Sequence, residues 1–187
     1  MKHIVFSIIF ICFAAVGFGQ SDEMLNIFVN KANLEYMKTN GPALQEVGKV
    51  VKKAHADADN NTIGQQKTEV ITIIHTAPSI IKNIYANANM TWRNPASLGA
   101  KFNGDFDEYV SYMRGMDEYV ELKISTSEVD ELRKKVLKLG KIKDEMKSSN
   151  YAIHESQENS IDNVNKIEDF SRLINESYEI LNKGINR

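Results

Sequence analysis

The chain has 187 residues, of which 42% are hydrophobic and 26% are charged, and its formal net charge is −2. This length suits a single domain that buries a hydrophobic core of its own. The near-neutral charge argues against a nucleic-acid-binding protein, which would need a strongly basic surface.

The first twenty residues predict a secretory signal peptide. Lys2 precedes an uncharged apolar run, Ile4–Phe18, and the small residue Gly19 follows it. This order is typical of a secretory signal, and the run is shorter than the roughly 20 apolar residues that span a bilayer. We therefore expect residues 1–20 to be cleaved, no stable membrane span, and a secreted product, extracellular or, in a bacterium, periplasmic.

The expected mature chain, 21–187, is free of cysteine because Cys12 is the only one in the sequence. Disulfides, zinc–thiolate sites and cysteine nucleophiles are thereby excluded, and the fold must depend on packing. Lys2 is the only charged residue removed, so 22 basic and 25 acidic residues remain. We expect a single helical domain, with 21–100 and 101–187 as possible lobes.

Two helices are expected at the start of the mature chain. Apolar residues recur at helical spacing within 24–37 and again within 44–54. Asn40-Gly41-Pro42 is expected to separate them, because Gly favours a helix C-terminus and Pro the first turn of the next helix.

A polar loop is expected at 57–64, followed by a third helix over 65–87. Pro78 should kink this helix, since proline lacks an amide donor and its ring clashes with the preceding turn. An irregular stretch, 87–105, comes next, and apolar spacing predicts a fourth helix over 106–120.

The C-terminal part of the chain has clear helix boundaries. Residues 125–128 read Ser-Thr-Ser-Glu, a capping box that should open a helix over 129–146. Residues 148–150 are expected to end it, and a last helix is expected over 161–184. The polar stretch 155–160 is either a loop, which we favour, or the middle of one long helix.

These elements predict an all-α fold, an irregular up-down bundle of five to six amphipathic helices. Charge supports antiparallel packing: residues 133–147 carry seven bases and two acids, whereas 155–179 carry seven acids and two bases. Residues 105–131 are also acidic, with nine acids and two bases. Opposite charges should therefore face each other between neighbouring helices.

The best metal candidate is weak. Asp57, Asp59 and Asn61 have the spacing of the first ligands of a calcium-binding loop, but Thr62 and Thr68 replace the Gly and Glu that such a loop requires. A polar loop between two helices is the simpler interpretation, and we expect no metal and no cofactor.

Sequons for N-linked glycosylation begin at Asn60, Asn89 and Asn175. They can be used only in a eukaryotic host.

Function is least constrained by the sequence. Aromatic residues and Met are concentrated in 85–120, where they could form core or line a binding surface. No nucleophile elbow, zinc-protease motif or phosphate-binding loop is present, so we do not expect an enzyme. We expect an exported binding protein for an apolar ligand such as a lipid, or for an extracellular protein. The alternative is a structural, self-associating homo-oligomer that uses the long helices of 126–183. The candidate binding residues are Tyr85, Trp92, Phe102, Phe106, Tyr109, Tyr112, Met113 and Tyr119.

Overall fold

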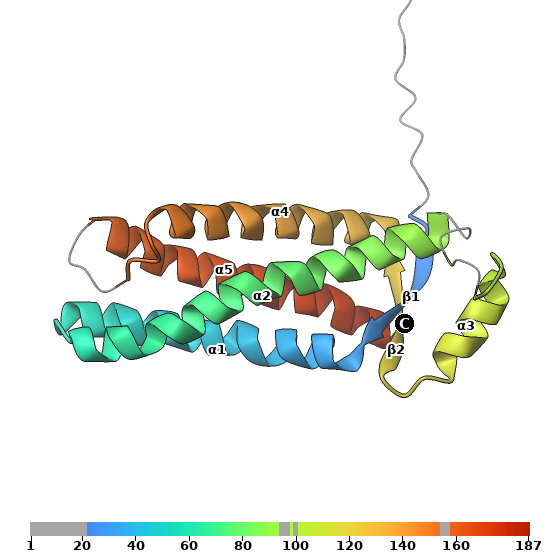
Figure 1. Ribbon diagram of the computed structural model, residues 1–187, viewed down its shortest axis with the longest axis horizontal. Helices are drawn as coiled ribbons and strands as arrows, with labels where there is room; N and C mark the ends of the chain where they lie inside the picture. The colour runs from blue at the N-terminus through green and yellow to red at the C-terminus, as the bar shows by residue number, and fades with distance from the viewer. Residues whose placement is uncertain (1–21, 94–97, 99–100, 154–157) are drawn as a thin grey trace, which may run out of the picture.

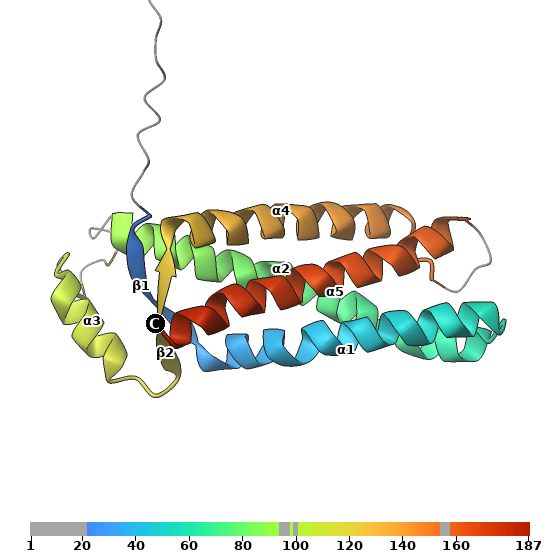
Figure 2. The ribbon, with the colours of Figure 1, turned by 180° about the vertical axis from the view of Figure 1, so that it is seen from behind.

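Four long helices form one antiparallel bundle (Figures 1 and 2). The computed structural model describes residues 22–93, 98, 101–153 and 158–187, so the expected signal peptide, 1–20, lies outside the described residues. Around the bundle, the first helix packs against the second and the last, and the third long helix packs against the same two. The four helices are α1 (Lys31–Ala56), α2 (Asn60–Arg93), α4 (Thr126–Ser148) and α5 (Glu158–Ile185).

A two-stranded antiparallel ribbon closes one end of the bundle, and a short helix lies beyond it (Figure 1). The strands are β1 (Met24–Asn30) and β2 (Tyr119–Ser125), and the short helix is α3 (Phe106–Arg114). The chain is therefore predominantly helical, with five helices in the described residues, as expected. The all-α expectation is corrected in one respect, because this small sheet was not foreseen.

The first expected helix is wrong over the seven residues of β1. Leu25, Ile27 and Val29 alternate along the strand and are all buried against the bundle. Their partners lie far along the chain, with Leu25 opposite Ile124 and Ile27 opposite Leu122. Apolar spacing over so short a stretch fits either a helix or a strand, and only the distant partner decides between them.

The expected break at Asn40-Gly41-Pro42 is also wrong, because α1 continues through it. A side chain at Gly41 would clash with Asn175 of α5, so this glycine allows the two helices to approach closely. The Ser171 hydroxyl of α5 donates a buried hydrogen bond of 2.7 Å to the Gly41 carbonyl oxygen. Packing against α5 thus compensates for a residue pair that favours termination in isolation.

The fourth expected helix is too long. It ends at Arg114, where Gly115 caps it, and the last part of the expected helix becomes β2. The Lys31 amide donates to the Glu118 carbonyl oxygen at 2.8 Å, just before the ladder of the sheet begins. Leu122 of β2 is then fully buried on the bundle side of the ribbon.

The capping box at the start of α4 is confirmed. The Ser125 hydroxyl accepts from the Glu128 amide, and the Glu128 carboxylate accepts from the Ser125 amide at 2.9 Å. Both ends of the described chain join this site: Asp22 accepts from the Ser127 amide at 3.0 Å, and Arg187 donates two hydrogen bonds to Glu128, at 2.7 and 2.8 Å. Burial favours a raised pKa for Glu128, but the hydrogen bonds from Arg187 and Ser125 prevail and lower it.

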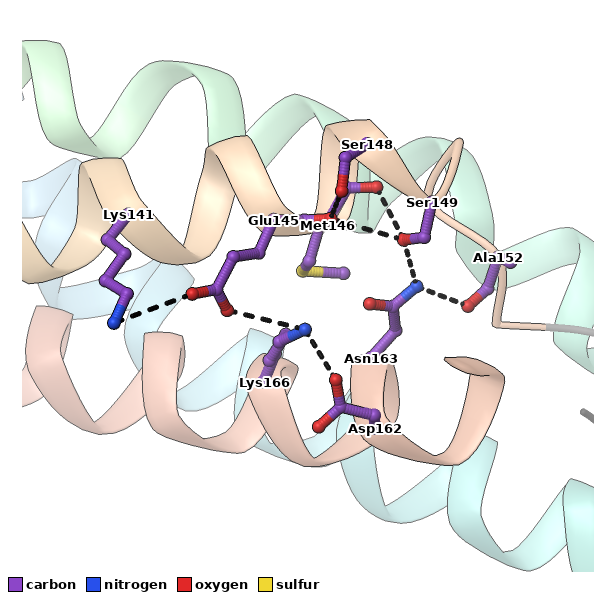
Figure 3. A network of polar contacts seen from close by, with 9 residues as sticks. All are labelled: Lys141, Glu145, Met146, Ser148, Ser149, Ala152, Asp162, Asn163 and Lys166. Carbon is purple, nitrogen blue, oxygen red and sulfur yellow. Dashed lines mark hydrogen bonds and ion pairs between the residues drawn. The ribbon is translucent and has the colours of Figure 1, made fainter. Parts of the chain in front are cut away.

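The expected end of α4 at residues 148–150 is confirmed as well. The Asn163 side chain of α5 donates to the Ser149 hydroxyl and to the Ala152 carbonyl, both at 2.7 Å (Figure 3). These bonds fasten the segment after α4 onto α5. Residues 155–157, half of the expected loop at 155–160, lie outside the described part of the chain. The other half is wrong, because 158–160 form the start of α5, which begins at Glu158.

The main core lies between the four long helices and the inner face of the ribbon. It joins residues from both halves of the chain, including the fully buried Met37, Leu44 and Phe170. The expected attraction between α4 and α5 is confirmed where Lys135 and Glu176 pair at 2.6 Å. Individual pairs of this kind add little stability, so the apolar core holds the bundle together.

Candidate functional site

The short helix α3 is positioned by polar groups at both of its ends. Asp105 accepts a hydrogen bond of 3.0 Å from the Glu108 amide and so caps the N-terminus. Asp107 and Glu108 lie in the first turn, where the helix dipole favours negative charge. At the other end Arg114 donates two hydrogen bonds, of 2.8 and 2.9 Å, to Glu121 of β2, and these lower the pKa of Glu121.

A second, smaller hydrophobic cluster attaches α3 to the outer face of the ribbon. Phe28 of β1, Val110 and Met113 are its buried members. Phe28 points away from the main core because side chains alternate along a strand, and its ring meets that of Tyr109 edge-on with centroids 5.9 Å apart. Phe106, Met116 and Tyr119 complete the cluster as partly buried neighbours.

The residues just before α3 extend this cluster toward solvent. The buried ring of Phe102 lies edge-on to Tyr109, with centroids 5.4 Å apart, and tilted against Tyr112 at 5.3 Å. Tyr112 is 42% exposed, and the Lys101 ammonium lies 3.5 Å from the centre of its ring, a cation–π contact. We call α3 together with Phe28, Lys101, Phe102 and Tyr119 the aromatic end.

Six of the eight candidate binding residues meet in the aromatic end. The other two do not join them there: Tyr85 packs against the main core, and the side chain of Trp92, near the end of α2, lies outside the described residues. The sequence reasoning missed Phe28, because that part of the chain was expected to be helical. Its alternation with Ile27 and Val29 is the signal that could have identified it. The six that meet are Phe102, Phe106, Tyr109, Tyr112, Met113 and Tyr119.

No protein-family model, curated protein or solved structure matches this chain.

Two surface cavities within the described part of the chain lie along α5, away from the aromatic end. The larger, of about 920 Å³, is lined mainly by charged residues of α1, α4 and α5. In it Lys135 contacts both Glu131 and Glu176; burial favours a lower pKa for Lys135, but these carboxylates prevail and raise it. Arg172 likewise contacts Asp169 and Glu176, so half of the charged residues that line this cavity pair with one another.

The smaller cavity, of about 320 Å³, lies between the other ends of α4 and α5. Here Lys166 joins the two helices, 3.4 Å from Glu145 of α4 and 2.6 Å from Asp162 of its own helix (Figure 3). Lys141 approaches the same Glu145 at 3.8 Å. Most residues that line the two cavities are therefore charged, whereas pockets for apolar ligands are lined mostly by hydrophobic and aromatic side chains.

The weak metal candidate forms the turn between α1 and α2. Asp57 caps the end of α1, and the Asp59 carboxylate accepts hydrogen bonds of 3.1 Å from the Thr62 amide and 2.6 Å from its hydroxyl. These bonds lower the pKa of Asp59 and start α2 at Asn60, earlier than expected. Within the described ranges, no group of three or more His, Cys, Asp or Glu residues is arranged to hold a metal ion.

The three sequons differ in their surroundings. Asn60 is exposed at the start of α2, and the side chain of Asn89 lies outside the described residues. Asn175 is half-buried against Gly41, and the hydroxyl of Ser177 in the same sequon is buried and bonded to the Leu173 carbonyl at 2.7 Å. A glycan on Asn175 would have to displace its contact with α1.

Among the helices that the structure describes, none is both long enough and apolar enough to cross a membrane.

Proposed function

We propose that the protein is an exported, non-enzymatic binding protein that contacts another protein through its aromatic end. Export rests on the signal-like sequence of residues 1–20. The observation that carries the binding proposal is Tyr112, whose ring contacts Phe102 at a tilted angle while the residue remains 42% exposed. Tyrosine is enriched among the residues that anchor protein interfaces.

The charge around Tyr112 favours a basic partner. Asp107 and Glu108 lie on the same short helix and are exposed, with no ion pair to either among the described residues. The ring of Tyr112 already accepts a cation, that of Lys101, on its face. Because Lys101 already lies on that ring, a lysine- or arginine-bearing surface would complement chiefly the unpaired carboxylates.

A protein partner fits the site better than an enclosed apolar ligand. Phe28, Val110 and Met113 are buried within the aromatic end, and the two cavities described along α5 are lined mainly by charged side chains. A lipid carrier would need a cavity of about 300–1,000 Å³ with a mainly apolar lining, whereas these two cavities have a mainly charged one.

Photo-crosslinking in the producing cells tests the proposal. A photoreactive phenylalanine analogue replaces Tyr112 in the full chain, and the matched control carries it at Val50, which is 41% exposed on α1. We expect a discrete crosslinked protein from position 112 and not from position 50. A chain that crosslinks equally at both positions, or at neither, would contradict the proposal.

A further inference from the structure

Helix α4 presents an uncompensated basic surface around an exposed leucine. Leu137 is 66% exposed, the highest value among the large hydrophobic residues of the described chain. Arg133, Lys134 and Lys141 lie three or four residues from it and so share its side of the helix, and Lys138 adjoins them because it lies four residues after Lys134. We call Arg133, Lys134, Leu137, Lys138 and Lys141 the basic face.

The charges of the basic face have few partners within the molecule. Among the described residues, Arg133, Lys134 and Lys138 form no ion pair, and Lys141 lies only within 3.8 Å of Glu145 with its side chain 80% exposed. By contrast, Lys135, one position away on the buried side, is paired twice with carboxylates. The basic face is therefore free to attract negative charge from outside.

Helix α3 presents the opposite arrangement. Its solvent-facing side carries Asp107, Glu108, Ser111 and Tyr112, which we call the acidic face, and all four residues are exposed. Glu108 and Tyr112 are four residues apart and so lie side by side on the helix. Within the described chain, each face thus has one exposed apolar side chain beside largely unpaired charges, which are negative on α3 and positive on α4. Next to Tyr112 the acidic face also meets the Lys101 ammonium.

We propose that the acidic face of one copy binds the basic face of a second copy. This inference rests on the proposed function, since it names the partner of the aromatic end. Leu137 would contact the exposed part of Tyr112, while Lys134 and Lys138 approach Glu108 and Asp107. The two faces lie at the end and along the side of the bundle (Figure 1), so unlike surfaces meet and the interface is heterologous.

The proposed contact buries little surface, so it should be weak. Two turns of α3 against three turns of α4 bury a smaller area than a stable complex does, which is about 1,200 Å² or more. Association should therefore be weak and should depend on charge. Salt screens exposed charges beyond about 10 Å at 0.1 M ionic strength, so added salt should dissociate the copies.

Sedimentation velocity of the purified mature chain tests the inference. We expect the average mass to rise with protein concentration at low ionic strength and to return to that of a monomer at about 1 M salt. The variant K134E/K138E and the variant E108K/S111K should each be monomeric alone. Asp107 is kept in the second variant because it stabilises the start of α3.

An equimolar mixture of the two variants is the decisive sample. Each pairing of unlike faces between the variants again joins opposite charges, so we expect association to return. The control K53E/K82E makes the same charge change on exposed residues of α1 and α2 and should associate like the wild type. Circular dichroism establishes that every variant is folded.

Two results would overturn the inference: a wild type that stays monomeric at every concentration in low salt, or a mixture that fails to associate although both variants are folded. Neither would remove the proposed function. That proposal falls if the crosslink at position 112 is absent or is no stronger than the one at position 50. A crosslink at position 112 to a different protein would keep the proposed function while excluding the second copy.

Discussion

The two faces of the β1–β2 ribbon bury their side chains to different extents. On the bundle side Leu122 and Ile124 are fully buried within a core built from all four long helices. On the other side Phe28, Val110 and Met113 each remain 8–9% exposed in a cluster of three. Helix α3 has only nine residues, too few to be stable without that contact. One ribbon thus supports a firmly packed bundle and a lightly attached helix, and binding regions are commonly drawn from such less stable parts.

The largest expected effect is a difference in the free energy of unfolding between variants of the main core and variants of the cluster at α3. Leu122→Ala should lower the free energy of unfolding by about 2–5 kcal/mol, because it leaves a cavity in the main core. Met113→Ala should lower it by less than half as much, since α3 can open locally. Urea denaturation of both variants measures the difference. Equal losses would show that α3 and the bundle unfold as one unit.

The next effect tests the close contact between α1 and α5. Gly41→Ala should lower the free energy of unfolding by about 1–3 kcal/mol, because the new methyl group meets Asn175. The matched control is Gly140→Ala, also in a helix but with open space around it, which should raise stability by about 0.5–1 kcal/mol. Adding Asn175→Ala to the first variant should restore part of the loss. Thermal unfolding at equal protein concentration compares the three.

A smaller effect depends on pH at the start of α4. The folded-state pKa of Glu128 is lowered, so its contribution to stability is present above the unfolded-state pKa, about 4.3, and is lost as the pH falls through the folded-state pKa. We expect Glu128→Gln to lose about 1 kcal/mol or less at neutral pH and to show a shallower decline below pH 4.3. Urea titrations across this range measure both. Parallel acid limbs in the two proteins would contradict the assignment.

The smallest effect concerns the attachment of α3. Arg114→Gln removes the paired hydrogen bonds to Glu121, which are largely exposed, so global stability should change by about 0.5 kcal/mol at most. Amide hydrogen exchange in α3 should nevertheless become faster, because its C-terminal end is released. Lys49→Gln, which removes an exposed pair with Glu46, should leave exchange in α3 unchanged. Unchanged exchange in Arg114→Gln would mean that the apolar cluster alone holds α3.

The sequence predicted best where the signal is local. The capping box of Ser125 and Glu128, the helical period of α2, α4 and α5, and the end of α4 at residues 148–150 all follow from neighbours within a few positions. It failed at the ribbon, where Ile27 and Leu122 are paired across most of the chain. Six of the eight candidate binding residues lie together because they are close in sequence. Phe28 is distant in sequence and lies beside them only because β1 pairs with β2.

By itself, the sequence determined that most of the described chain is helical and where several helices begin and end, because caps and apolar periods act through bonds and contacts within a turn or two. Tertiary structure decided that residues 24–30 form a strand, that α1 passes through Gly41 and Pro42, and that α3 docks on the outer face of the ribbon. Each of these outcomes depends on a contact with a distant segment. The free energy of that contact exceeds the weak conformational preference of the local sequence.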